Sequence, residues 1–434
     1  MKGMKMLKSA AALIAVSALT AQCSLLGLEE EENNDALLAL ALIAGSGSNS
    51  CTTYCPDSSS FVTKSGTISS SETWGNCTAL DGTVFIQSGV TVTIPAGSCV
   101  QGRSGSSLFV LNGADIIANG TAGSPIIFTS SQATGSRAPA DWGGLVIIGD
   151  ATASKSDNTE GTAPQAYGAG STDSDSSGSL TYARFEYAGF EVATDQELNA
   201  LSMYTVGSGT TLSYLQAHMT KDDGFEWFGG AANADHLVGS GVGDDAFDAD
   251  RGYRGTLSYL IDYRYPQSSG VSISSNPRGF EMDGADNGGS CDANSRCSQV
   301  TISNFTLVGL NSDYSNTDHQ GMYFTEGLTV TSLSNGVVVG YAELGEVEGK
   351  DAGATTTLNC GSNLRSDFTS FTDNDNGGTA TLNGCGSVTS TNRSSVVVSD
   401  WSESNPSAAP VFFTLANSAT DSDWYSSWTY WVNK

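Results

Sequence analysis

The chain has 434 residues, of which 18 are Lys or Arg and 46 are Asp or Glu, so its formal net charge at pH 7 is −28. This balance excludes a nucleic-acid binder, because nucleic-acid backbones bind basic surfaces. An anionic membrane surface would also repel such a protein unless a covalent lipid anchors it. The expected partners are therefore cations, basic proteins or neutral glycans, although surface acids also serve simply to keep an extracellular β protein soluble.

Residues 1–22 predict a signal peptide. Lys2, Lys5 and Lys8 give it a basic start, and the apolar stretch 10–21 is too short to span a bilayer. The sequence Leu-Thr-Ala-Gln-Cys that ends at Cys23 resembles the lipobox of a bacterial lipoprotein. The resemblance implies lipid attachment at Cys23 and a location in the outer membrane or at the cell surface. The alternative is an ordinary secretory signal followed by a chance cysteine.

Residues 23–50 predict a flexible tether between the lipidated cysteine and an ordered body. Four glutamates at 29–32 precede an apolar run at 36–44 that is too short for a transmembrane helix, and a Gly-Ser-Gly-Ser stretch follows. This composition resembles the tethers of spirochaetal lipoproteins. Without the three signal lysines, the mature chain has 15 basic and 46 acidic residues, a net charge of −31. We expect a single domain over residues 51–434.

Short β-branched runs separated by turn residues predict strands along this body. Val90, Val92 and Ile94 alternate with threonines, and Asn-Gly and Gly-Gly pairs divide the later runs. No helical stretch of twelve residues stands out beyond residue 50. Residues 155–178 and 191–198 indicate long surface loops. The body is therefore all-β, either a sandwich or a solenoid.

A repeat favours the solenoid. Residues 222–226 read Asp-Asp-Gly-Phe-Glu and residues 244–248 read Asp-Asp-Ala-Phe-Asp, 22 residues later. This offset is about one coil of a parallel β-solenoid, whereas a sandwich has no reason to repeat at that interval. The repeat predicts that Phe225 stacks on Phe247 in the core and that Asp223 lies beside Asp245 on a surface.

The nine cysteines leave eight once Cys23 carries lipid, an even number that suits an oxidising compartment. Cys77 and Cys99 are 22 residues apart and Cys360 and Cys385 are 25 apart, so each pair could bridge adjacent coils. Eight cysteines allow 105 pairings, so the connectivity stays open. The expected pairs are Cys77–Cys99, Cys360–Cys385, Cys291–Cys297 across a short loop and, by elimination, Cys51–Cys55.

Four segments together resemble a group of secreted bacterial β-helix proteins. They are residues 142–149, 222–230, 244–252 and 279–283. The resemblance implies the right-handed parallel β-helix of pectate lyases but no particular activity. The ending from Trp424 to Trp431 is similar to the Trp-rich C-termini of that group. We expect it to form an aromatic cap over the open C-terminal end of the coil stack, since an uncapped solenoid exposes core and strand edges.

Acidic residues recur at fixed phases of the repeat, and carboxylates on adjacent coils should stand about 4.8 Å apart. Like charges at that distance repel unless a cation or proton joins them, and dense oxygen ligands suit Ca²⁺. The alternative is that these acids cap turn N–H groups or pair with Arg251, Arg254 or Arg278. The candidate calcium ligands are Asp223, Glu226, Asp245, Asp248 and Asp250, within a longer acidic ladder that adds Asp222, Asp244, Glu281 and Asp283.

The expected function is that of a lipid-anchored surface or outer-membrane protein with a structural, adhesive or ligand-binding role. A glycan or a protein is the expected ligand. The alternative is a polysaccharide lyase or glycoside hydrolase, because paired carboxylates suit glycoside cleavage. We expect no catalysis, since the three histidines share no motif and the sequence has no His-Glu-x-x-His or Gly-x-Ser-x-Gly.

Overall fold

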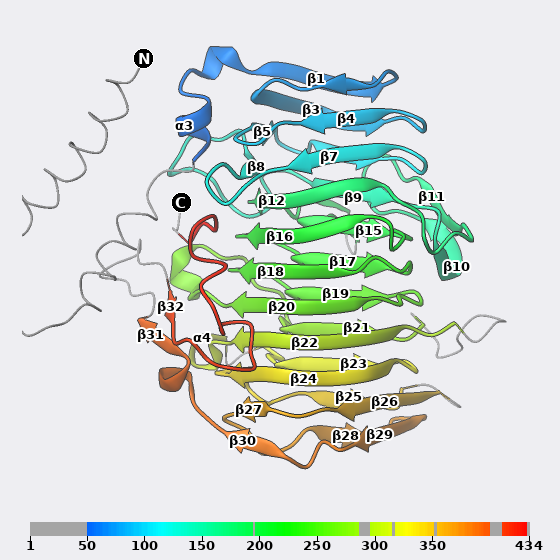
Figure 1. Ribbon diagram of the computed structural model, residues 1–434, viewed down its shortest axis with the longest axis vertical. Coiled ribbons are helices and arrows are strands. Elements are labelled where there is room, and N and C mark those ends of the chain that lie inside the picture. The colour runs from blue at the N-terminus through cyan, green and yellow to red at the C-terminus, as the bar shows by residue number, and fades with distance from the viewer. Residues whose placement is uncertain are drawn as a thin grey trace, which may run out of the picture. The chain divides into compact units, whose positions relative to one another are not determined.

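The computed structural model describes residues 50–193, 196–285, 296–314, 317–350, 354–399 and 410–431 (Figure 1). All of these residues belong to one compact unit, Ser48–Lys434. The signal peptide, Cys23, residues 23–49 of the tether and Cys291 lie outside the described residues. Among the residues described, no helix is long and apolar enough to cross a membrane.

The fold is a right-handed parallel β-helix, in which 26 strands of the described residues pair in parallel along a stack of coils (Figure 1). Each coil passes through three sheets in turn, which we call sheet 2, sheet 3 and sheet 1 in chain order. Sheet 1 consists mainly of β6 (Ser107–Val110), β9 (Gly144–Ile148), β15 (Leu201–Tyr204), β17 (Phe225–Phe228), β19 (Phe247–Asp250), β21 (Phe280–Asp283), β23 (Met322–Thr325), β25 (Glu346–Glu348) and β28 (Thr372–Asn374).

Long strands in the middle of the stack run through sheet 2, turn a corner and continue in sheet 3. β12, for example, pairs with β7 through its first half and with β8 through its second half. The long strands are β12 (Gly178–Glu186), β16 (Thr211–His218), β18 (Ala234–Ser240), β20 (Thr256–Tyr263), β22 (Gln299–Val308) and β24 (Thr329–Val339).

Separate short strands form the two ends of the stack. In sheet 2 they are β2 (Glu72–Thr73), β4 (Thr91–Ile94), β7 (Asp115–Asn119), β26 (Thr355–Cys360) and β29 (Thr379–Asn383). In sheet 3 they are β5 (Cys99–Gly102), β8 (Ile126–Ser130), β27 (Leu364–Ser366) and β30 (Val388–Ser390), while β1 (Val62–Ile68) and β3 (Cys77–Ile86) run through sheets 3 and 1.

The predicted core register is confirmed. Phe225 pairs with Phe247, and Phe247 with Phe280, with ring centroids 5.7 and 5.6 Å apart. All three side chains are fully buried. Side chains alternate along a strand, so Glu226 and Asp248, one position on, point out of the core. The 22-residue interval is thus one coil.

The corner between sheets 2 and 3 carries a ladder of aromatic rings. Tyr182, Tyr214, His236 and Tyr259 lie in the left-handed region, with φ between 47° and 57°. Their rings stack at successive centroid distances of 4.3, 4.3 and 4.5 Å. A bulky residue with positive φ is strained, and stacking on both neighbours offsets this strain. Further along, the same corner is occupied by Asn304, Asn335 and Asn363, whose side chains are hydrogen-bonded to one another.

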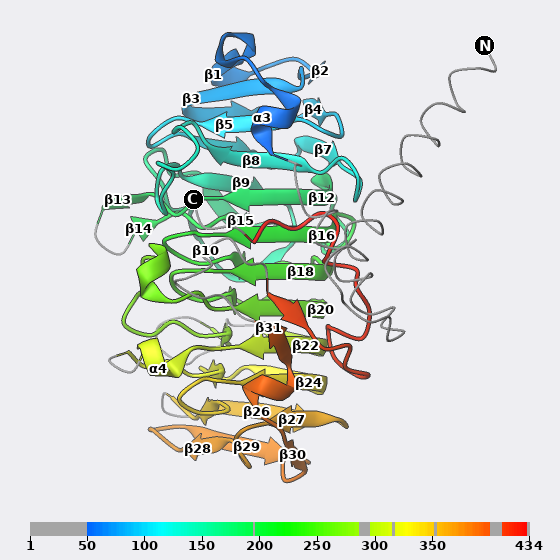
Figure 2. The same ribbon diagram turned by 90° about the vertical axis from the view of Figure 1, so that its left-hand side faces the viewer.

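The aromatic C-terminal segment does not cap the end of the stack, as the sequence led us to expect. Residues 413–431 run back along the outer side of sheet 3 (Figures 1 and 2). Arg184 donates a hydrogen bond to the carbonyl of Trp428, and Tyr265 donates one to that of Trp431. The physical reason is that sheet 3 has an apolar outer face, which includes Val238 and Ile261 and which this segment buries.

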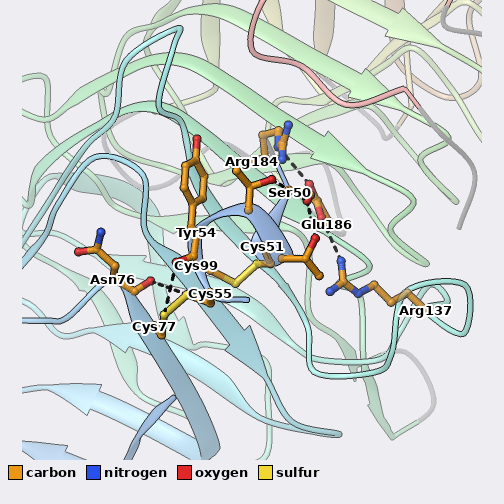
Figure 3. Close-up of a disulfide and its surroundings, with 12 residues drawn as sticks. Ser50, Cys51, Tyr54, Cys55, Asn76, Cys77, Cys99, Arg137, Arg184 and Glu186 are labelled. Atoms are coloured by element: carbon orange, nitrogen blue, oxygen red, sulfur yellow. Dashed lines mark hydrogen bonds and ion pairs between the residues drawn. A yellow bond between two sulfur atoms is a disulfide. The ribbon is translucent and has the colours of Figure 1, made fainter. Parts of the chain in front are cut away.

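Two of the expected disulfides are wrong. The short helix α3 (Cys51–Tyr54) lies over sheet 3, where Cys51 bonds Cys99 and Cys55 bonds Cys77, with Cα atoms 5.2 and 5.8 Å apart (Figure 3). Cys77 and Cys99 are register neighbours, as their spacing predicted. Two cysteines four residues apart share one face of a helical turn, so each takes a partner from the sheet.

The disulfide between Cys360 and Cys385 forms as predicted, with Cα atoms 4.9 Å apart. Cys297 is also disulfide-bonded, and its expected partner Cys291 lies outside the described residues.

Candidate functional site

The outer face of sheet 1 carries a column of carboxylates. Glu226 on β17 pairs in register with Asp248 on β19, which pairs with Glu281 on β21. The inward neighbours Phe225 and Phe247 fix this orientation, because side chains alternate along a strand. The shared phase of Glu226 and Asp248 predicted from the sequence is therefore confirmed, and Glu281 extends the column by one coil.

A second column lies in the turns just before these strands, and its members hydrogen-bond to backbone. The side chain of Asn199 accepts a hydrogen bond from the backbone N–H of Asp223, at 3.2 Å. Asp223 accepts one from the N–H of Asp245 at 2.8 Å, and Asp245 accepts one from the N–H of Arg278 at 2.6 Å. Asp223 and Asp245 lie side by side as predicted, but they are 6% and 2% exposed and do not form a surface.

Carboxylate oxygens from the two columns converge around Asp223. One carboxylate oxygen from each of Asp223, Glu226 and Asp248 lies within 4.8 Å of the other two, and the same holds for Asp222, Asp223 and Asp244. We call these five residues the acidic cluster. The spacing suits Ca²⁺, since two oxygens on opposite sides of that ion are about 4.6–5.2 Å apart. Asp223 belongs to both groups and is the centre of the cluster.

Two of the five candidate calcium ligands fall outside these groups. Asp245 accepts a hydrogen bond from the backbone N–H of Arg278, as the turn-capping alternative predicts. Asp223 accepts the same kind of bond from Asp245, so the turn-capping alternative applies to it as well, although it also belongs to both groups. Asp250 forms an ion pair with Arg251 at 3.1 Å, as the alternative of arginine pairing predicts. Asp222 and Asp244 take their places, because each precedes a turn aspartate and lies at the same phase of neighbouring coils. The repeated Asp-Asp dipeptide was the signal for them.

Burial and mutual repulsion dominate the electrostatics of the acidic cluster. Burial raises the pKa of Asp223, Glu226 and Asp248 well above the ordinary carboxyl range, and the neighbouring carboxylates raise each pKa further. Asp222 is shifted in the same direction, by burial and then by Asp244. Burial also raises the pKa of Asp244, to about 6, although its hydrogen bond from Ser274 opposes that shift. These carboxyl groups cannot all ionise without a counter-ion.

No sequence pattern indicated Glu160, which lies in an insert between β9 and β12. This insert contains the hairpin β10 (Thr152–Asn158) and β11 (Ala166–Ala169). Tyr167 holds the hairpin against Tyr204 of sheet 1, with ring centroids 4.8 Å apart. The backbone N–H of Glu160 donates to the Tyr204 hydroxyl at 3.3 Å. Burial and the charge of Glu197 raise the pKa of Glu160 to about 7.

A second insert brings Glu197 to the same region. It contains the short strands β13 (Glu191–Ala193) and β14 (Gln196–Glu197), which lie between β12 and β15. Lys221 forms ion pairs with both Glu191 and Glu197 and so ties this insert to the coil that carries Asp222. The inserts were predicted as surface loops. Because they lie outside the repeat, the sequence period could not predict that Glu160 and Glu197 would lie near sheet 1.

The nearby cations are paired with other acids. Arg278 pairs with Glu281 and stacks over the ring of Tyr323, 4.2 Å from its centroid. Within the part of the chain that the structure describes, no lysine or arginine forms an ion pair with Asp223, Glu226 or Asp248. One oxygen of Asp248 is buried without a hydrogen-bond partner. Such an oxygen is costly to bury unless it binds a proton or a cation.

The fold and this site define a right-handed parallel β-helix protein with an acidic outer face on one sheet. The chain belongs to the family of the pectate-lyase-like beta helix domain, whose model matches residues 66–429. Comparisons with curated proteins and with solved structures gave no match. The expected likeness to the pectate lyase β-helix is thereby confirmed for the body of the chain, at the level of the fold.

Proposed function

We propose that the acidic cluster binds Ca²⁺ and that the ion forms part of a ligand-binding surface on sheet 1. Support comes from the three carboxylates of Asp223, Glu226 and Asp248, which each place one oxygen within 4.8 Å of the others and have no cationic partner among the described residues. Ca²⁺ takes six to eight oxygen ligands. A bound ion would keep the carboxylates ionised and retain coordination positions for a ligand.

A glycan is the ligand class that this chemistry favours. Hydroxyl or carboxylate oxygens of a sugar can complete the coordination of a protein-bound Ca²⁺. The acidic surroundings would repel a polyanion in the absence of the ion, so glycan binding should depend on Ca²⁺. A protein ligand with an exposed carboxylate would obey the same rule.

The sequence supports a lipid anchor as the second part of this function. The basic start, the apolar stretch and Cys23 suit a lipoprotein signal, and the tether that follows would hold the β-helix near an outer-membrane or cell surface. We therefore propose a lipid-anchored binding protein whose partners are the membrane, through the lipid, and a Ca²⁺-dependent glycan or protein ligand.

A binding screen tests this function. The full chain is applied to an array of neutral and acidic glycans and of surface proteins, once with millimolar Ca²⁺ and once with EDTA. Binding that requires Ca²⁺ and is lost in Asp223→Asn supports the proposal. Binding that is equal in both buffers would place the ligand site elsewhere on the molecule.

A polysaccharide lyase or hydrolase is the second candidate, favoured by the raised pKa values of about 7 for Glu160 and about 6 for Asp244. A carboxyl group in that range can act as a general acid near neutral pH. We expect no new reducing ends and no unsaturated products from pectin, alginate or neutral glycans. Turnover that disappears in Glu160→Gln would instead establish the enzyme.

A further inference from the structure

A buried amide lies at the edge of the acidic cluster. Asn199 stands between β14 and β15 and is 1% exposed. Its side-chain oxygen accepts a hydrogen bond from the backbone N–H of Asp223 at 3.2 Å. Its side-chain nitrogen donates to the carboxylate of Glu226 and, at 3.3 Å, to the hydroxyl of Ser202. The amide therefore contacts two of the candidate cation ligands at once.

The orientation of this amide is fixed by its partners. The backbone N–H of Asp223 is a donor, so it must face the amide oxygen of Asn199. The amide nitrogen then has to face Glu226, whose ionised carboxylate only accepts hydrogen bonds. Turning the amide round would place donor against donor and acceptor against acceptor. Asn199 is thus held as a donor toward Glu226.

The position of the Glu226 carboxylate depends on this contact. Among the described residues, Asn199 alone donates a hydrogen bond to that carboxylate, and no lysine or arginine pairs with it. A free glutamate side chain samples many rotamers and must lose this freedom when it binds a cation. Asn199 removes that cost in advance, because it holds the carboxylate where one oxygen lies within 4.8 Å of oxygens from Asp223 and Asp248.

The phase of the repeat shows why an amide matters at this position. Asn199 occupies in its coil the place that Asp223 and Asp245 occupy in the next two coils. Each of the three side chains accepts a hydrogen bond from a backbone N–H of the following coil. An aspartate at 199 would cap the turn in the same way, but an ionised aspartate has no N–H to donate. Capping alone therefore does not account for the amide, whereas the contact with Glu226 does.

Ser202 completes this end of the acidic column. It is the register neighbour of Glu226 on the preceding coil, and it is fully buried. Its short side chain places no further acid before Glu226, and its hydroxyl accepts a hydrogen bond from the Asn199 amide. The column of carboxylates thus ends in two neutral side chains that are bonded to each other.

We propose that Asn199 is a positioning residue of the cation site, which fixes the place of the Glu226 carboxylate by donating a hydrogen bond to it. The role rests on the proposed binding of Ca²⁺ by the acidic cluster and adds a residue that acts through a ligand. Partners that hydrogen-bond to metal ligands typically contribute roughly 10–100-fold to metal affinity. Loss of the donor at 199 should therefore weaken cation binding by that factor.

Terbium luminescence of the full chain measures this contribution. Tb³⁺ resembles Ca²⁺ in size and in its preference for oxygen ligands, and its higher charge keeps weakened sites measurable. Asn199→Asp retains the turn cap, as Asp223 and Asp245 do on the next coils, but it replaces the donor by a charge that repels Glu226. Its Kd for Tb³⁺ should rise roughly 10–100-fold. The number of water molecules on the ion, from decay rates in H₂O and D₂O, should rise by about one.

Two further variants control for charge and for folding. Asn199→Ser is neutral and lacks the amide nitrogen, so it should weaken binding in the same direction. If Asn199→Asp does not fold, as judged by circular dichroism, Asn199→Ser carries the same comparisons. Asn119→Asp, at the exposed end of β7 in sheet 2, adds the same charge away from the cluster and should leave the Kd unchanged.

The outcomes separate this role from the proposed function and from a purely structural one. If the parent shows no saturable Tb³⁺ binding that Ca²⁺ displaces, the cation site is contradicted and the role of Asn199 with it. A parent that binds Tb³⁺ while Asn199→Asp binds it equally or more tightly overturns the role of Asn199 alone. In the Glu226→Ala background, Asn199→Asp should weaken binding no further, because the group that it positions is gone. The same loss in that background would show that Asn199 supports the turn rather than Glu226, and would overturn the proposal.

Discussion

Replacing Phe247 with Ala tests the register on which the whole fold depends. Its side chain is fully buried between Phe225 and Phe280, with ring centroids 5.7 and 5.6 Å away. Deleting a buried phenylalanine costs about 3–5 kcal/mol through lost transfer energy and the cavity that remains. Two lost aromatic contacts, each worth about 0.5–1.5 kcal/mol, place the expected loss toward the upper end of that range.

The assay is urea unfolding at constant pH and Ca²⁺, followed by far-UV circular dichroism, with Phe413→Ala as the control. Phe413 is 42% exposed, so its truncation removes less buried apolar surface and should cost clearly less than the truncation of the fully buried Phe247. If Phe247→Ala loses less than about 1 kcal/mol, the stacked core between these coils is wrong. An equal loss in both variants would show that the assay does not distinguish core from surface.

The remaining predictions concern the anchor and the acidic cluster. Cys23→Ala should move the protein from the detergent phase to the aqueous phase, and a variant that partitions like the parent contradicts lipidation at this residue. For the raised carboxyl pKa values, the folded state binds more protons than the unfolded state between about pH 4 and pH 7. Without Ca²⁺, stability should therefore fall as pH rises from 5 to 8, and thermal unfolding in EDTA should show a steady decrease in melting temperature. Glu160→Gln should flatten the upper part of this profile, whereas Asp115→Asn on sheet 2 should leave it unchanged. A profile that rises over this range would contradict the assigned direction of the shifts.

Sequence periodicity predicted the fold because each coil repeats one physical requirement. Phe225 and Phe247 recur after 22 residues because each must fill the same place in the core, one coil further along the stack. Glu226 and Asp248 follow from the same phase. The period cannot predict which side chains the turns bury. Asp223 and Asp245 lie inside the turns, where each carboxylate accepts a backbone hydrogen bond from the next coil.

Features that break the repeat could not be predicted in this way. Glu160 reaches sheet 1 from an insert that has no counterpart in neighbouring coils. The 22-residue repeat therefore does not predict where its side chain lies. Cys77 and Cys99 were assigned to each other because they are neighbours in register, but Cys55 and Cys51, at the short helix α3, bond to them instead. The C-terminal aromatic segment binds the side of the stack because sheet 3 offers it an apolar face, a property of the assembled coils.

Isothermal titration calorimetry with CaCl₂ measures the central claim, that the acidic cluster is a cation site. Extracellular Ca²⁺ sites often have Kd values of roughly 10⁻⁴–10⁻³ M, which at 2 mM Ca²⁺ would stabilise the fold by about 0.6–2 kcal/mol. The account predicts a saturable heat with a Kd in that range, lost in the double variant Asp223→Asn with Asp248→Asn and retained in Asp115→Asn. No saturable heat from the parent chain, or the same heat from the double variant, would contradict it.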